Sequence, residues 1–331
     1  MSDELPSIPI VDVSALSIDD ADSERVATAI RRACRDYGFF YVVGHGVSSL
    51  LVERLERLSE QFFARPEDEK MAIGMACGGR AWRGFFPVGA EFTVGRPDRK
   101  EGLYFGAELA PDHPKVAAGV PLHGANLFPQ IPDFRETILD YLDAMTQLGH
   151  TLMRGIALSL GLKAPYFAER YTSDPLILFR IFHYPPPTAD EQFSEWGVGE
   201  HTDYGLLTIL RQDDTGGLQV KSQGRWLEAP PIPNSFVCNI GDMLDRMTGG
   251  LYRSTPHRVR NESDRGRLSF PFFFDPNFDA EVKPIDPVLR VADDKEERWD
   301  RSSIHEFHGT YGEYLLGKVA KVFPELGGGV L

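Results

Sequence analysis

A series of short β-like segments in the second half of the chain restricts the fold more than any other feature. Each is rich in β-branched, leucine or aromatic residues, and turn-forming residues separate it from the next. They cover residues 176–184, 205–211, 217–220, 235–240, 257–259 and 268–274. Strands of this length and spacing favour an antiparallel sandwich or barrel. We therefore expect a mainly β core over residues 175–280.

Helix patterns surround this core. Residues 7–120 begin with alternating strand and helix patterns, which predict an α/β N-terminal region: strands at 8–13 and 39–43, and helices at 19–35 and 48–63. Apolar residues at helical spacing predict one long connecting helix over 130–162, with Gly161 as its stop. A last helix is expected within 300–323. The expected fold class is mainly β with flanking helices, in one compact unit.

The charge balance excludes several kinds of partner. The 331 residues include 35 Lys and Arg against 49 Asp and Glu, a formal charge of -14, and such a surface repels nucleic acid and anionic lipid. No apolar run reaches the roughly 18 residues of a membrane helix. The acidic N-terminus lacks signal-peptide features, and three widely spaced cysteines indicate no disulfide framework. We expect a cytoplasmic protein with a small-molecule substrate, and its oligomeric state stays open.

One histidine stands out for its context. His201 is followed by Asp203, a spacing that nine histidines and 49 acids in 331 residues would produce about once by chance. Residues 203–210, however, resemble the entrance to a strand, where positions i and i+2 point to the same face. His201 and Asp203 are thus expected to direct a nitrogen and an oxygen at one point. With His257 they would complete a two-histidine, one-carboxylate triad, which leaves positions open on Fe(II).

A cation follows in the same half of the chain. Arg267 and Ser269 share a face if residues 268–274 form a strand, and the run that follows them is strongly apolar. A buried arginine in such surroundings requires an anion. The planar guanidinium suits bidentate binding of a carboxylate, with the Ser269 hydroxyl as a second donor. An acidic cosubstrate would supply that carboxylate.

These motifs together resemble the isopenicillin-N-synthase-like family of non-haem Fe(II), 2-oxoglutarate-dependent dioxygenases. The resemblance covers about residues 7–320. It rests on His201-x-Asp203, Asn239-Ile240-Gly241-Asp242, His257, Arg267-x-Ser269, and the N-terminal segments at 8–12 and 38–47.

The resemblance implies a distorted jelly roll, the double-stranded β-helix, that holds iron. His201, Asp203 and His257 match the iron ligands, and Arg267 and Ser269 match the pair that binds the distal carboxylate of the cosubstrate 2-oxoglutarate. Tyr184 matches a tyrosine that assists them. The implied reaction consumes O2 and oxidises, by default hydroxylates, a small molecule with release of succinate and CO2. Phe182 stands where plant members commonly carry Asn, so one polar contact near the cosubstrate is absent from the motif.

Other functions stay open on the sequence. The same fold serves iron-dependent oxidases that do not use 2-oxoglutarate, ethylene- and succinate-forming enzymes, and it could serve a noncatalytic binding module; a zinc hydrolase is a weaker alternative. Arg83 or Arg99 could bind an acidic substrate group. Candidate lining residues for the substrate pocket are Trp82, Phe86, Tyr104, Phe105, Phe272 and, as a lid, the segment 299–307; each could equally belong to the core.

Overall fold

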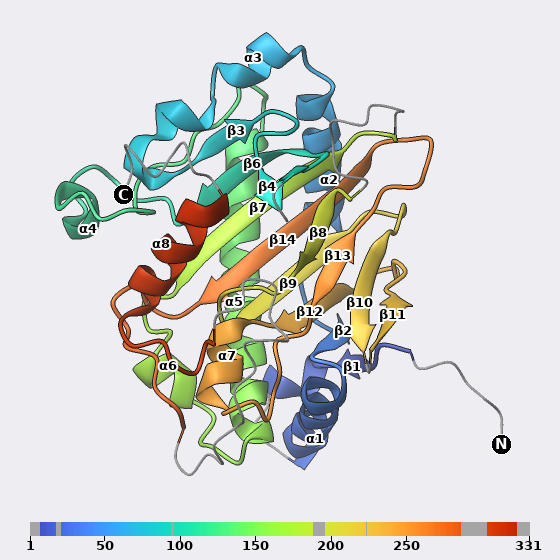
Figure 1. The fold of residues 1–331 in the computed structure, drawn as a ribbon, viewed down its shortest axis with the longest axis vertical. Helices are drawn as coiled ribbons and strands as arrows, with labels where there is room; N and C mark the ends of the chain where they lie inside the picture. Colours follow the sequence, from blue (N-terminus) through green and yellow to red (C-terminus); the bar gives the residue numbers. More distant parts are fainter. Residues whose placement is uncertain are drawn as a thin grey trace.

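Two β-sheets form the centre of the molecule (Figure 1). The computed structural model describes residues 7–17, 21–93, 96–187, 196–222, 224–285 and 303–322. The large sheet has the strand order β1 (Ile10–Asp12), β2 (Phe39–Val43), β12 (Phe236–Ile240), β9 (Leu207–Gln212), β14 (Arg267–Asp275), β7 (Leu176–Tyr184), β6 (Glu101–Gly106) and β3 (Gly84–Phe86). The small sheet has the order β11 (Arg225–Glu228), β10 (Leu218–Ser222), β13 (His257–Val259) and β8 (Val198–His201). The predicted mainly β, jelly-roll fold class is confirmed.

The N-terminal region supplies strands to both edges of the large sheet. β1 pairs with β2 in parallel, and β2 pairs with β12 in antiparallel register. At the other edge, β6 pairs with β7, and β3 pairs with β6. A short hairpin of β4 (Phe92–Thr93) and β5 (Arg96–Pro97) lies between β3 and β6 in the chain. The first 106 residues therefore build part of the same sheet that carries β7 and β14.

Helices cover one face of the large sheet. The longest, α5 (Phe134–Ser159), runs behind the sheet in Figure 1, and α1 (Ala21–Asp36) and α2 (Ser49–Phe63) pack against it. It ends just before Gly161, whose φ of 74° a helix cannot continue. The shorter helical segments are η1 (Ser14–Ser17), α3 (Glu67–Met71), η2 (Met75–Ala81), α4 (Pro114–Ala117), α6 (Tyr166–Arg170) and α7 (Asp242–Met247).

The C-terminal helix, α8 (Tyr311–Val322), begins later than the sequence suggested. Residues 303–310 form turns, so the expected helix over 300–323 is wrong in this part, and residues 300–302 and 323 lie outside the described residues. Gly309 has a φ of 139°, which no helix contains. A capping box then starts α8, because Glu313 accepts from the Thr310 backbone and donates its own N–H to the Thr310 hydroxyl.

The strands of the large sheet direct alternate side chains to opposite faces. On the helix-covered face of β7, Phe179 contacts Tyr141 of α5 at 4.9 Å between ring centres. Phe272 lies opposite Phe179 on β14, and Phe105 stacks on Phe179 from β6, so both belong to the core under α5. The expectation that Phe105 and Phe272 line a pocket is therefore wrong. Tyr184, Phe182 and Arg180 of β7 point to the other face.

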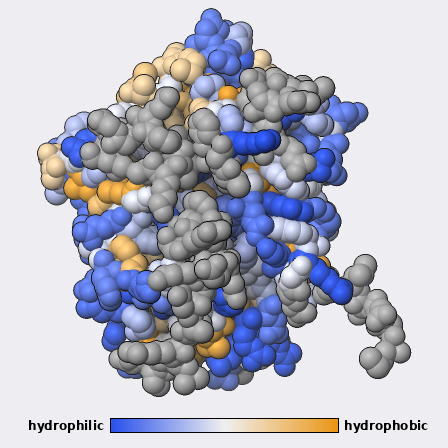
Figure 2. Space-filling view, in the orientation of Figure 1, coloured by the Kyte–Doolittle hydropathy of each residue, from blue (hydrophilic) through white to orange (hydrophobic). Residues whose placement is uncertain are grey.

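Among the residues described, no helix is both long and apolar enough to span a bilayer. Most of the residues that Figure 2 shows in colour are hydrophilic, and the hydrophobic ones among them form separate patches. The large hydrophobic side chains that are most exposed are Ile10, Leu50, Met71 and Leu251.

Candidate active site

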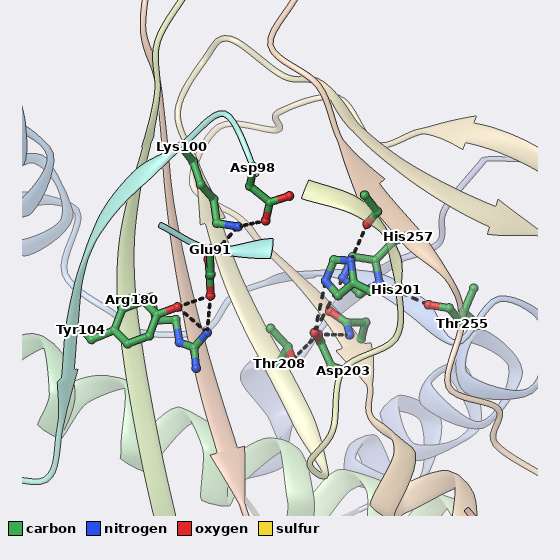
Figure 3. Close-up of polar contacts among 12 residues, drawn as sticks. Glu91, Asp98, Lys100, Tyr104, Arg180, His201, Asp203, Thr208, Thr255 and His257 are labelled. Atoms are coloured by element: carbon green, nitrogen blue, oxygen red, sulfur yellow. Dashed lines mark hydrogen bonds and ion pairs between the residues drawn. The ribbon is translucent and has the colours of Figure 1, made fainter. Parts of the chain in front are cut away.

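Three side chains of metal-ligating type meet between the two sheets (Figure 3). His201 is the last residue of β8 and His257 is the first of β13, and the antiparallel pairing places them opposite each other. Asp203 lies in the turn that leaves β8. One ligand atom from each residue lies within 4.8 Å of the other two. The structure thus brings together the three residues that the sequence selected.

The turn, and not a shared strand, brings Asp203 to His201. Residues 202–206 connect β8 in the small sheet to β9 in the large sheet, so the expectation that both side chains leave one strand is wrong. The turn can form because residue 205 is glycine. A Cβ atom there would overlap the carboxylate of Asp275 on β14. The crossing between the sheets therefore depends on this close approach.

Both imidazoles are oriented by backbone carbonyls. Nδ1 of His201 lies 2.8 Å from the Gly199 oxygen, and Nδ1 of His257 lies 3.2 Å from the Thr255 oxygen. With the proton on Nδ1 donated to these oxygens, Nε2 of each ring carries the free lone pair. Both Nε2 atoms lie 3.8 Å from the Asp203 Oδ1 atom. The free lone pairs and Oδ1 therefore surround one common point.

The second carboxylate oxygen of Asp203 is held by two donors. Oδ2 accepts from the Thr208 hydroxyl at 2.5 Å and from the Asn239 amide at 2.7 Å. Burial opposes ionisation of Asp203, but the two imidazoles and these hydrogen bonds outweigh it and lower the pKa of Asp203. Burial and the neighbouring His201 lower the pKa of His257 to about 4. At neutral pH the set presents a carboxylate and a neutral imidazole, which are the forms that bind a metal.

This donor set fits a first-row divalent metal ion. Two imidazole nitrogens and one carboxylate oxygen form a facial arrangement that leaves coordination positions free for other ligands. No other cluster of three histidine, cysteine or acidic side chains with this geometry occurs among the described residues. The fit follows from the lone pairs of the two Nε2 atoms and of Asp203 Oδ1, which are directed at one common point.

Arg267 is a buried cation without an acidic partner in the part of the chain that the structure describes. It is fully buried, and it lies opposite Tyr184 in the pairing of β14 with β7. Its Nε donates to the Gly216 carbonyl and its Nη2 to the Gln212 amide oxygen, whereas Nη1 donates to no atom of the described residues. The hydroxyls of Ser269 and Tyr184 lie 3.2 Å apart beside it. A guanidinium and two hydroxyls so placed can hold a carboxylate.

Sequence reasoning missed a buried chain of alternating charges on the same face. Nη1 of Arg180 on β7 lies 3.6 Å from Oε1 of Glu91. Nζ of Lys100 lies 2.7 Å from Oε2 of Glu91 and 2.5 Å from Oδ2 of Asp98. Tyr104 joins the chain, because its hydroxyl donates to Glu91 and accepts from Arg180. Figure 3 shows this chain beside the His201, Asp203 and His257 cluster. The available signal was the two-residue periodicity that places Arg180 on the same face as Tyr184.

The ammonium group of Lys100 lies over the ring of Phe182, 5.2 Å from its centre. Burial opposes the charge of Lys100, but Asp98 and Glu91 outweigh it and raise its pKa. Phe182 lies opposite Ser269, one step along the face from the Arg267 and Tyr184 pair. Phe182, which stands where plant members commonly carry Asn, is therefore next to the positive charge of Lys100.

Comparisons with known proteins agree with this geometry. Residues 175–276 match the model of the 2OG-Fe(II) oxygenase superfamily, and residues 8–131 match the model described as the non-haem dioxygenase in morphine synthesis N-terminal region. A Dictyostelium discoideum protein named "Probable iron/ascorbate oxidoreductase" is 51% identical over 99% of this chain and 98% of its own. The chain belongs to the 2OG-Fe(II) oxygenase superfamily.

Other relatives of the oxygenase have named substrates or ligands. A 1-aminocyclopropane-1-carboxylate oxidase of Dictyostelium mucoroides is 41% identical, covering 98% of this chain and 97% of its own. A homoarginine-6-hydroxylase of Oryza sativa is 37% identical, covering 98% and 99%. The crystal structure of a full-length Neurospora crassa protein in complex with alpha-KG, which is 2-oxoglutarate, has a TM-score of 0.78 and 27% identity, covering 97% and 98%.

Family membership defines the chemistry of the oxygenase. It is an oxidoreductase that uses Fe(II), 2-oxoglutarate and O2 to oxidise a small molecule.

Proposed function

We propose that His201, Asp203 and His257 bind Fe(II), and that Arg267 with Ser269 and Tyr184 holds the distal carboxylate of 2-oxoglutarate. The observation that carries the first assignment is the convergence of one ligand atom from each residue within 4.8 Å. The second is supported by the unpartnered Nη1 of the buried Arg267.

Iron bound at this site supplies the activation of O2: one oxygen atom enters the succinate formed as 2-oxoglutarate loses CO2, and the other enters a C–H bond of the substrate. The chain's own residues position the reactants. Thr208 and Asn239 fix the Asp203 carboxylate, so Oδ1 alone is left to face the metal. Arg267 fixes the far end of the cosubstrate inside a water-poor interior, where its electrostatic attraction is strong.

We propose that the substrate is a small amino acid. The supporting observation is the buried chain of Arg180, Glu91, Lys100 and Asp98 beside the metal-ligating cluster, because charges of both signs near the metal site suit a substrate that carries both an acidic and a basic group. Two relatives of the oxygenase are named for amino acids, 1-aminocyclopropane-1-carboxylate and homoarginine.

The residue assignments are tested without substrate. Metal-free protein receives Fe(II) and then 2-oxoglutarate under anaerobic conditions, and the visible charge-transfer band of the chelate is titrated. We expect the band in the wild type, its absence in Asp203→Ala, and a roughly 100-fold weaker 2-oxoglutarate affinity in Arg267→Met, which loses a charged bidentate contact. An unchanged titration in Arg267→Met would refute the carboxylate role of Arg267.

The substrate class is tested by succinate release. 1-Aminocyclopropane-1-carboxylate, L-homoarginine, L-arginine and L-lysine are compared with neutral aromatic compounds of similar size. At least one amino acid should accelerate succinate release well above the rate without substrate, and mass spectrometry should find the oxidised product. Acceleration by the neutral aromatic compounds alone would refute the proposal.

We further propose that the oxygenase acts in the cytoplasm on a free small molecule, without a nucleic-acid or membrane partner. The formal charge of -14 supports this proposal. Cys34, Cys77 and Cys238, which are free cysteines, also fit a reducing compartment.

A further inference from the structure

Arg83 is a second buried arginine whose guanidinium, like that of Arg267, has nitrogen atoms without a hydrogen-bond partner among the described residues. Arg83 directly precedes β3 and is only 1% exposed. Its Nη2 donates to the Leu122 carbonyl at 2.8 Å, but Nε and Nη1 donate to no atom of the described residues. None of the described carboxylates forms an ion pair with its guanidinium. Burying a guanidinium with two unpartnered nitrogens, which carry three N–H groups, is energetically unfavourable, so Arg83 lowers the stability of the folded chain unless an anion binds there.

Arg83 lies on the same face of the large sheet as the proposed active site. A Cβ atom on Gly106 would overlap the Arg83 Nη2 atom, so the guanidinium fills the space above this glycine. Gly106 lies opposite Leu178, two residues beyond the Tyr104 and Arg180 pair. Because strand side chains alternate, residues 102, 104 and 106 of β6 share the face to which Phe182 and Arg180 point.

Four cations therefore follow one another along this face. Arg267 lies opposite Tyr184, and Lys100 lies over Phe182. Arg180 is the next residue of β7 on this face, and Arg83 lies beyond it, above Gly106. The two in the middle are paired with Glu91 and Asp98. The two at the ends form no ion pair with any of the described residues, although the more distant charge of Glu108 acts on Arg83. From residue 184 to residue 178 a strand extends for about 20 Å, so one five-carbon diacid cannot reach both ends.

Arg83 and Arg180 are close enough to repel each other. Burial and the positive charge of Arg180 lower the pKa of Arg83 to about 9 against the opposing negative charge of Glu108, which still leaves the guanidinium charged at neutral pH. Arg180 also has an unpartnered Nε, although its Nη1 donates to Tyr104 at 2.9 Å. An anion between the two side chains would accept these free N–H groups and remove the repulsion.

We propose that Arg83, together with Arg180, binds the carboxylate of the substrate. This assignment rests on the proposed amino-acid substrate and specifies which end of it is recognised. The cosubstrate carboxylate and the substrate carboxylate are then bound by separate guanidiniums at the two ends of one face. The reacting carbon of the substrate lies between them, on the side of the metal-ligating cluster.

The test compares Arg83→Met with Arg80→Met, which removes an exposed arginine three residues away. The amino acid that the wild type oxidises is measured against its carboxamide, which keeps the shape but loses the charge. In Arg83→Met, KM for the acid should rise about 100-fold, KM for 2-oxoglutarate should stay within about twofold, and the preference for the acid over the amide should disappear. Arg83→Lys keeps the positive charge but loses the bidentate guanidinium, so its KM for the acid should lie between those of the wild type and Arg83→Met.

A binding measurement gives a readout that is independent of turnover. Protein loaded with Mn(II) and 2-oxoglutarate under anaerobic conditions is titrated with the acid and with the amide, and the fluorescence of Trp82, beside Arg83 in the chain, reports occupancy. Tighter binding of the acid in the wild type and in Arg80→Met, but not in Arg83→Met, supports the assignment. The melting temperature of unliganded Arg83→Met should be unchanged or raised, because an unpaired buried charge is removed.

Failure of this inference differs from failure of the proposed function. If an amino acid is oxidised and Arg83→Met keeps the wild-type KM and acid preference, the assignment of Arg83 is refuted. A melting temperature lowered by many degrees with an unchanged KM would refute it too, since Arg83 would then be structural. If no amino acid stimulates the wild type, the proposed substrate class fails. Arg83 is then tested with butyrate and butyramide alone, and equal binding of butyrate to wild type and Arg83→Met would overturn the inference.

Discussion

The hydrogen bond from Thr208 to Asp203 allows the geometry of the site to be tested with a small change. Thr208→Val preserves the shape of the side chain and its preference for a strand but removes the donor to Oδ2. A hydrogen bond to a charged group contributes about 1.5–3 kcal/mol. If that energy holds the carboxylate in its ionised, metal-ready form, its loss should weaken the affinity for metal about 10- to 100-fold, the range typical of such supporting contacts.

The assay is an anaerobic calorimetric titration of metal-free protein with Mn(II) or Fe(II). Thr146→Val is the matched control, because the Thr146 hydroxyl donates to a backbone carbonyl within α5, in a different part of the fold. Asn239→Ala removes the other donor to the same oxygen, and the double variant should lose more than the sum of the two single losses if each donor partly compensates for the other. Equal metal affinity in Thr208→Val and the control would refute the reasoning.

Three further changes test other parts of the site. Gly205→Ala places a Cβ atom against the Asp275 carboxylate, so urea unfolding should show a loss of about 1–3 kcal/mol together with weaker metal binding; full stability would contradict the role of this close approach. Burial raises the pKa of Asp275 to about 7. The unfolded chain loses this proton near pH 4, so the stability due to the protonated carboxyl is present below about pH 4 and is lost as pH rises to about 7. Asp275→Asn should therefore match the wild type at about pH 4 and exceed it at about pH 8, by up to about 4 kcal/mol, and a parallel pH profile would contradict the buried, protonated state. Tyr184→Phe removes the hydroxyl beside Ser269 and should raise the KM for 2-oxoglutarate about 3- to 10-fold, as for one hydrogen bond of about 0.5–1.5 kcal/mol; the KM should not change if Tyr184 only packs.

The sequence determined the local features of this protein. The β-rich segments became strands with nearly the predicted limits for β7, β12 and β14, because side-chain type and two-residue periodicity act over a few neighbours. The strands at 198–201 and 225–228 were not predicted, since each holds only four residues, at least two of which are charged, histidine or glycine. The metal-ligating character of His201, Asp203 and His257 could also be predicted, because it depends on residue types and their order, which the sequence gives directly.

Only the tertiary structure decided how distant segments combine at the site. Residues 82–104 form only short strands joined by turns, and nothing in their local pattern indicated that Arg83, Glu91 and Lys100 share one face with Arg180. Strand pairing of β3 and β6 beside β7 places them there, and such pairings link residues far apart in the chain. The same holds for the crossing turn at Gly205, whose fit depends on Asp275. Which residues could bind iron was therefore a property of the sequence, whereas what surrounds the iron site follows from contacts that no local pattern encodes.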